Sequence, residues 1–248
     1  MAPELPSIYA NIATKVRSDF GFGPLEPIDI TKVARLSTVT CVYKPLDSGI
    51  SGIFVRAGSA QVVLINSAKT LGHQNYTLAH ELYHVLYDRE VAGQPCYAAS
   101  PKTGARERAA DEFAAHLLMP GQGLYYYLAA RGSGREISIV DVVYLEQLFG
   151  VSHRAMLNQL RSLKLIGRKE AENWQIGIRQ TARQWGYDDA LYRPTDRKGI
   201  ETDYAEKARW ALDRNLISFA KYEELLADAR LFDEIVGGFG GGDDDISD

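Results

Sequence analysis

The chain has 248 residues, of which 46% are hydrophobic and 24% are charged, and its formal net charge is −4. This composition is typical of a soluble globular protein with one large domain or two smaller ones, and the charge argues against a protein that coats nucleic acid. No run approaches the roughly 18 apolar residues of a membrane span, and the first residues lack a secretory signal. With two cysteines, Cys41 and Cys96, we expect reduced thiols and a cytoplasmic location.

The first part of the chain predicts two helices and then a small sheet. Residues 7–20 place Ile8, Ile12, Val16 and Phe20 at every fourth position, which predicts a helix. Residues 28–37 predict a second, shorter helix. Runs rich in β-branched residues at 39–43, 52–56 and 61–66 predict three strands of an antiparallel sheet, with residues 57–60 as a hairpin connection.

The next stretch contains the motif His80-Glu81-x-x-His84. On a helix, positions i and i+4 lie on one face, so the two imidazoles can bind a single ion. Glu81 lies beside that face, where its carboxylate can act as a general base on water without being a ligand. This arrangement predicts a zinc site with a catalytic glutamate.

The residues around the motif bear on a second interpretation, in which both histidines are ordinary core residues with accidental spacing. Apolar residues surround the motif, which predicts a buried helix. Polar side chains in such a helix cost several kcal/mol if they lack partners, about 2–7 kcal/mol for a neutral group. A bound metal ion would remove that cost.

A later helix supplies a third candidate ligand. Residues 107–118 carry an apolar stripe at helical spacing, and Pro120 ends the segment. Glu107 shares a face with this stripe and is expected to point at the metal. Asp111, one turn on, can accept a hydrogen bond from a liganding histidine and so fix its tautomer. In the alternative interpretation, Glu107 belongs to a solvated run with Arg106 and Arg108.

These two segments together resemble the ImmA/IrrE family of metallopeptidases. The resemblance is specific over about residues 50–120 and fades by about residue 166. It implies a zincin-like α+β fold in which His80, His84 and Glu107 bind Zn²⁺ and Glu81 is the base. A similarity to thermolysin-type peptidases implies that Asp111 supports a ligand. The family resemblance also implies a substrate, a helix-turn-helix transcriptional repressor whose cleavage relieves repression of stress-response or mobile-element genes.

The remainder of the chain predicts helices and connectors. Residues 88–104 form a long loop that could cover the cleft. Residues 138–149 and 154–163, joined by a tight turn, resemble a helix-turn-helix; in that case Ser152, His153, Arg154, Asn158 and Arg161 would face a DNA groove. Residues 168–187 are predicted to continue as helix, residues 188–202 to form a polar connector, and residues 203–214 and 218–235 to form two further helices.

We therefore predict four regions: a metallopeptidase domain at 1–132, a helix-turn-helix-like region at 133–187, a helical pair at 188–236 and a disordered tail at 237–248. The predicted function is that of a zinc endopeptidase acting on a protein. One alternative is a DNA-binding regulator with a structural zinc site, although the local basic charge gives few phosphate contacts. Another is a protein that sequesters a repressor without cutting it.

Overall fold

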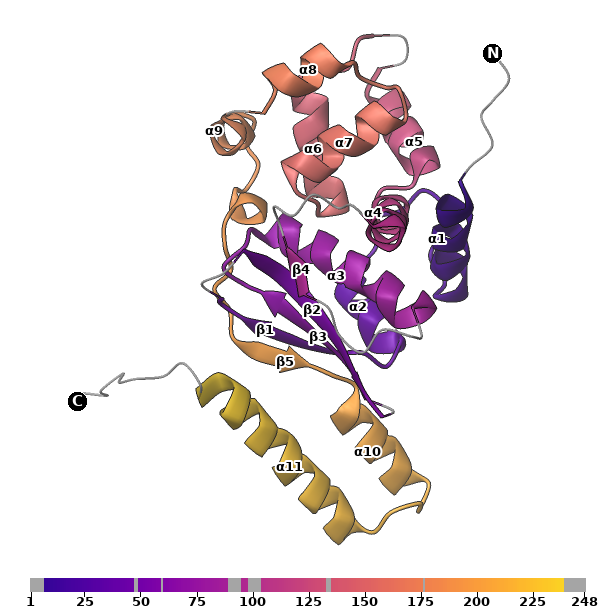
Figure 1. Ribbon diagram of the computed structural model, residues 1–248, viewed down its shortest axis with the longest axis vertical. Coiled ribbons are helices and arrows are strands. Elements are labelled where there is room, and N and C mark those ends of the chain that lie inside the picture. Colours follow the sequence, from indigo (N-terminus) through magenta and orange to yellow (C-terminus); the bar gives the residue numbers. More distant parts are fainter. Residues whose placement is uncertain are drawn as a thin grey trace, which may run out of the picture.

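The computed structural model describes residues 7–46, 49–58, 60–88, 95–97, 104–132, 135–175 and 177–238. Figure 1 shows a small twisted sheet covered on one side by helices, with a helical hairpin extending beyond the edge of the sheet. The first half of the chain contains α1 (Ile8–Asp19), α2 (Ile30–Leu36), β1 (Thr40–Lys44), β2 (Ile50–Ala57), β3 (Ala60–Asn66), α3 (Leu71–Tyr87), β4 (Pro95–Tyr97) and α4 (Ala105–Leu118).

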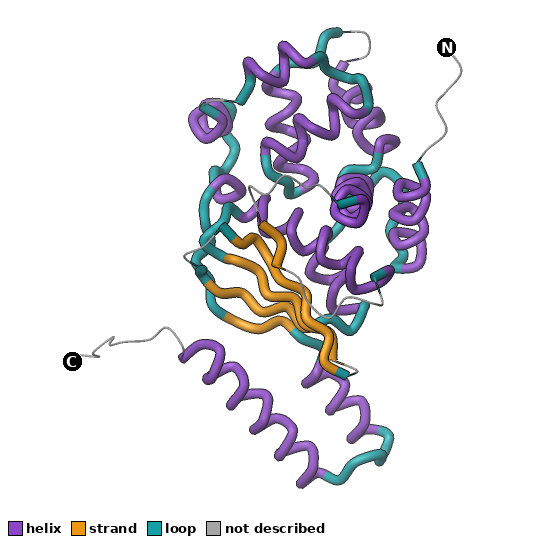
Figure 2. The backbone as a smooth tube through the Cα atoms, in the orientation of Figure 1, coloured by secondary structure: helices purple, strands orange, loops and turns teal. Residues whose placement is uncertain are grey.

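The sheet has five strands in the order β4-β2-β3-β1-β5 (Figure 2). It is mixed, with both parallel and antiparallel pairs. The predicted hairpin is confirmed, because β2 and β3 pair antiparallel with Ala57 opposite Ala60. The expectation of a wholly antiparallel sheet was wrong, because β3 lies between β2 and β1 and pairs with β1 in parallel. A position inside the sheet suits β1, whose Cys41, Val42 and Tyr43 are all buried.

Helix α3 packs against β2 and β3 on the helical side of the sheet. The closest approach is at Gly52 on β2, where a Cβ atom would lie 2.6 Å from Cγ2 of Thr77 and 3.4 Å from Cγ of Glu81. Real Cβ contacts are not this short, so only glycine allows β2 to lie this close to α3. The strand therefore forms a wall directly beside the His-Glu-x-x-His motif.

Arg17 joins α1 to the end of α4. Its guanidinium is buried and donates to the carbonyl oxygens of Gly23 and Leu117, at 2.8–3.0 Å and 2.6 Å, and to that of Glu26. Burial lowers the pKa of Arg17 to about 10, which leaves the side chain charged at neutral pH. A cation is favourable beside the last carbonyls of a helix, and here it fixes the carboxyl end of α4.

The helices α5 (Gly121–Gly132), α6 (Ile139–Phe149), α7 (His153–Ser162), α8 (Arg168–Asn173) and α9 (Ile178–Gln184) follow. Apolar residues of α5 to α8 join the same core as the sheet and α3, so that Leu124 and Val142, on either side of the boundary expected at 132–133, belong to one cluster. Ala182 of α9 packs in a second cluster with Val143, Leu191 and Tyr192. Continuous helix over residues 168–187 was a wrong prediction. The chain breaks between α8 and α9, where Gly177 has a left-handed φ of +77°.

The segment predicted as a polar connector, residues 188–202, returns to the sheet instead. It contains the short helix η1 (Ala190–Tyr192) and β5 (Gly199–Glu201), which pairs antiparallel with β1. The chain ends in α10 (Tyr204–Asp213) and α11 (Phe219–Gly238), which form the hairpin beyond β5 (Figure 1). Helix α11 takes in the first two residues of the expected tail, and residues 239–248 lie outside the described part. Among the described helices, none is both long and apolar enough to cross a membrane.

The contact at Gly52 can be tested with Gly52→Ala. The added methyl group is expected to lower the free energy of unfolding by about 1–3 kcal/mol, because it overpacks the interface between β2 and α3. Adding Thr77→Ser removes the methyl group that it meets at 2.6 Å and should recover part of the loss. Urea unfolding of the two variants measures both effects, and a Gly52→Ala chain as stable as the unmodified protein would contradict the close approach.

Candidate metal centre

Helix α3 presents the motif inside the protein. His80 and Glu81 are each 1% exposed, and His84 is buried at the edge of the same surface. Leu78, Leu82 and Val85 are buried as well, which confirms the predicted burial of this helix on nearly every side. The imidazoles are therefore held in place by packing.

Three electron-pair donors converge between α3 and α4. His80 Nε2 lies 3.3 Å from His84 Nε2 and 3.2 Å from Oε2 of Glu107, and His84 Nε2 lies 3.5 Å from Oε1 of Glu107. The ligand atoms of these three residues all lie within 4.8 Å of one another. The structure thus brings together the three residues that the sequence predicted as ligands.

The other nitrogen of each imidazole is held by a carboxylate. His80 Nδ1 lies 2.9 Å from Oδ1 of Asp111, and His84 Nδ1 lies 2.7 Å from Oδ2 of Asp88. Arg106 in turn holds Asp88, with its Nη2 2.7 Å from Oδ1. Burial opposes ionisation of Asp88, but hydrogen bonds from His84 and Arg106 outweigh it and lower the pKa of this carboxyl.

These contacts fix the tautomers of the imidazoles. A carboxylate at Nδ1 keeps the proton there, so that Nε2 of a neutral imidazole carries a lone pair. Burial lowers the pKa of His84 below its ordinary 6.5, although the hydrogen bond to Asp88 acts in the opposite direction. The lowered pKa keeps this ring neutral. Two nitrogen lone pairs and a carboxylate then face one another, and a cation removes their mutual repulsion.

The spacing of the donors can be compared with the needs of a small divalent ion. Ligand atoms about 2.0–2.1 Å from a tetrahedral zinc ion lie about 3.3–3.4 Å apart. The three measured separations, 3.2, 3.3 and 3.5 Å, are close to that value. The donor set of two imidazoles and one carboxylate fits the same ion, and three protein ligands leave a position open.

Glu81 occupies the side of α3 that faces β2, because its Cγ lies next to Gly52. It is therefore enclosed between the helix and the strand, adjacent in sequence to the first candidate ligand. A carboxylate in this setting is shielded from bulk water, and its interactions with charge are stronger than at the surface.

Sequence reasoning missed Asp88. Its signal was its position four residues after His84, at the end of α3, where it can reach back to the preceding turn. The loop predicted to cover the cleft falls mainly on residues 89–94 and 98–103, outside the described part of the chain. Between these two ranges lies β4, which pairs with β2 at the edge of the sheet.

Only some of the residues expected to face DNA have side chains that are exposed to solvent. Arg154, Asn158 and Arg161 are exposed on α7, whereas Ser152 accepts a hydrogen bond from Ala155 N as the N-cap of that helix. His153 points inward and is bonded at both ring nitrogens, by Oε1 of Glu146 at Nδ1 and by the carbonyl oxygen of Trp174 at Nε2.

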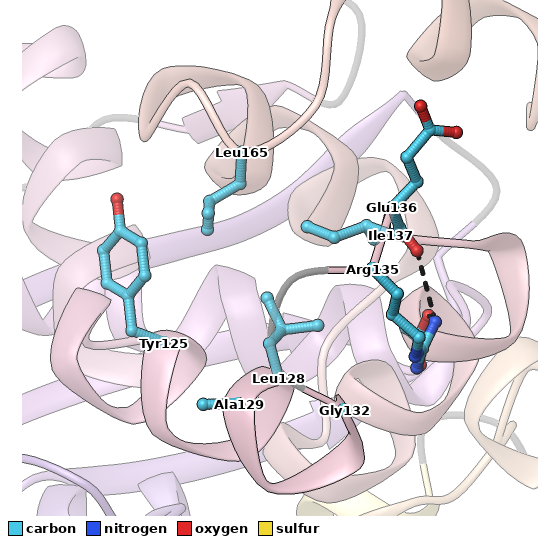
Figure 3. Close-up of a pocket in the computed structure, with 9 residues that line it drawn as sticks. Tyr125, Leu128, Ala129, Gly132, Arg135, Glu136, Ile137 and Leu165 are labelled. Carbon is cyan, nitrogen blue, oxygen red and sulfur yellow. Dashed lines mark hydrogen bonds and ion pairs between the residues drawn. The ribbon is translucent and has the colours of Figure 1, made fainter.

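A pocket of about 270 Å³ lies elsewhere, between α5 and the segment that leads to α6 (Figure 3). Leu128, Ile137 and Leu165 project into it, and Arg135 turns toward the carbonyl oxygen of Glu136 and toward Asp141. None of the lining residues is a candidate ligand or base, so this pocket is separate from the metal centre.

Comparison with known proteins agrees with this geometry. The profile of a family described as Peptidase_M78, IrrE N-terminal-like domain, matches residues 37–161, just over half of the chain. The matched range contains both candidate histidines, Glu81 and Glu107. No curated protein gives a significant match. The chain therefore belongs to the Peptidase_M78 family, and its α+β fold is that of a zincin-like domain of this family.

Proposed function

We propose that the protein is a zinc-dependent endopeptidase. The observation that carries this proposal is the convergence of His80, His84 and Glu107 at 3.2–3.5 Å, with a carboxylate behind each imidazole. These three residues would hold Zn²⁺, Asp111 and Asp88 would orient the two rings, and Glu81 would be the catalytic base. Family membership supports a peptidase, and these residues would supply the metal ligands and the general base that peptide hydrolysis needs.

The chemistry of the chain's own residues follows from these positions. A bound zinc ion would supply Lewis acidity that polarises the scissile carbonyl. The carboxylate of Glu81 accepts a proton from the attacking water as the oxygen–carbon bond forms, and then donates that proton to the nitrogen of the leaving amine as the carbon–nitrogen bond breaks. Packing against Gly52 holds Glu81 on the β2 side of α3 throughout this transfer.

The proposed substrate is a helix-turn-helix transcriptional repressor, whose cleavage would relieve repression of stress-response or mobile-element genes. This part of the proposal rests on the resemblance to the ImmA/IrrE family. A peptidase that acts on a cytoplasmic transcription factor would itself act in the cytoplasm.

Binding to DNA through α7 is a second candidate, which the exposure of Arg154, Asn158 and Arg161 favours. It is the weaker one, because His153 is turned into the core and few basic residues remain to contact phosphates. Salt-dependent binding of duplex DNA that Arg154→Ala/Arg161→Ala abolishes would support it.

The catalytic assignment predicts different outcomes for two substitutions on α3. Glu81→Gln should retain zinc and lower cleavage by about 10²–10⁴-fold, because it removes only the proton acceptor. His80→Ala should lose both zinc and cleavage. Affinity-tagged Glu81→Gln serves as a trap in the source cell, and partners identified by mass spectrometry are then incubated with the unmodified protein and weighed intact.

In that experiment, a captured repressor cut at one bond by the unmodified protein and left whole by Glu81→Gln is the expected result. A captured partner that the zinc-loaded, unmodified protein leaves intact would instead indicate sequestration. Full activity in either variant would remove the assigned roles.

The carboxylates behind the imidazoles give a further prediction. Asp88→Asn and Asp111→Asn should each weaken zinc binding by about 10–100-fold, because an amide holds the Nδ1 proton less strongly and lowers the basicity of the ring. Competition with a zinc-binding dye measures the affinity. Asp213→Asn is the matched control, since in the described part of the chain Asp213 pairs with Arg209 on the exposed face of α10, away from the candidate ligands. Equal affinities in all three variants would contradict the role given to Asp88 and Asp111.

Removal of the metal should abolish cleavage reversibly, with no residue substituted. Dialysis against a chelator is expected to abolish cleavage, and one equivalent of zinc per chain should restore it, because three protein ligands define a single site. Cleavage that persists in chelated protein with no measurable zinc would show that the reaction does not depend on the metal.

A further inference from the structure

Three arginines converge on one buried acid beside α9. Oδ2 of Asp189 lies 3.0 Å from Nη2 of Arg179 and 2.6 Å from Nη2 of Arg183, and its Oδ1 lies 3.0 Å from Nε of Arg193. The side chain of Asp189 is only 5% exposed, whereas those of the arginines are 50–62% exposed. The buried carboxylate of Asp189 thus lies below three guanidinium groups that reach the surface.

The charges of this arginine cluster do not cancel. Asp189 balances one of the three cations. Asp188 is 75% exposed and approaches only Arg193, at 3.8 Å, so it offsets that side of the cluster weakly. Arg179 and Arg183, one turn apart on α9, retain the excess positive charge.

Each of the two arginines on α9 has a hydrogen-bond donor that Asp189 does not use. Arg179 donates to Asp189 through Nε and Nη2, and Arg183 donates through Nη2, so that within the described residues neither Nη1 group is bonded to this acid. Gln180 and Gln184 line the same open surface hollow as the two arginines and add amide groups. Pre-oriented guanidinium groups match the oxygens of a phosphate, since two parallel N–H groups can bind two oxygens at once.

We infer that this arginine cluster binds a phosphate-bearing ligand, either a free polyphosphate or nucleotide or the phosphates of a nucleic-acid backbone. Three guanidinium groups surround one buried carboxylate, which leaves a net positive charge, and the two arginines on α9 both line the open hollow.

The cluster is connected to the start of α3. The carbonyl oxygen of Arg193 accepts the hydrogen bond of Leu71 N, at 3.0 Å, and Thr195 N and Asp196 N donate to the carbonyl oxygen of Ser67. The backbone of Arg193 therefore caps α3, the helix that carries the candidate ligands His80 and His84, while its side chain belongs to the cluster. A ligand that orders this segment should also stabilise the first turn of α3.

The test is calorimetric titration of the full-length protein with inorganic pyrophosphate and, separately, with a short DNA duplex. Pyrophosphate is expected to bind with a Kd below about 1 mM, and Arg179→Ala/Arg183→Ala should weaken this at least about tenfold, because charge-assisted hydrogen bonds are lost. Arg179→Lys/Arg183→Lys keeps the charge and should lose several-fold. Arg209→Ala, which alters an exposed arginine on α10, should change nothing.

The titrations are repeated in a His80→Ala background, which is expected to hold no zinc to which the probe could bind. The outcome is then independent of the proposed peptidase activity. Duplex binding much tighter than that of pyrophosphate, and equally dependent on Arg179 and Arg183, would identify a nucleic acid as the source of the phosphates. Pyrophosphate binding alone would identify a small ligand. If neither probe binds at millimolar concentration, or if Arg209→Ala weakens binding as much as the double variant, the inference is overturned.

Discussion

The hydrogen bonds at Nδ1 of His80 and His84 determine what the rest of the site can do. Each of these nitrogens is beside a carboxylate, so the lone pairs of both rings are directed toward Glu107 rather than elsewhere. Without Asp111 and Asp88, either ring could place its proton at Nε2, and the three donors would become an ordinary hydrogen-bonded cluster. The burial of α3 adds to this selection, because a low dielectric disfavours protonated imidazoles.

The fold holds α3 along its whole length with contacts that come from distant parts of the sequence. Gly52 admits β2 beside the motif, and Gly72 allows the first turn of α3 to touch the backbone of Val151 and Ser152. The same turn is capped by the carbonyl oxygen of Arg193. The residues that surround α3 therefore extend well beyond the range that the family profile covers, into the segment that returns from α9 to β5.

The sequence predicted a feature correctly where a local pattern, such as helical spacing, placed residues of matching chemistry side by side. Helical spacing placed Glu107 and Asp111 on one face of α4, and both reach His80 as expected. What could not be predicted depends on contacts distant in sequence. The parallel pairing of β1 with β3 and the addition of β5 arise from which strands meet, and strand composition does not encode that. The break at Gly177, whose φ is left-handed, was missed because one glycine costs a helix only about 1 kcal/mol and so does not by itself predict an end.

The inward position of His153 has a consequence for the proton balance of folding. Its Nε2 must donate, since Trp174 offers only a carbonyl oxygen, and a second proton lies between Nδ1 and the buried Glu146. Burial raises the pKa of Glu146. Burial alone would lower the pKa of His153, but the hydrogen bond to Glu146 outweighs it, and the pKa of His153 is raised. At neutral pH the unfolded chain carries an ionised glutamate and a largely neutral histidine, so folding takes up a proton here. The stability that this pair contributes is therefore complete in acid and declines as the pH rises through the folded pKa of His153.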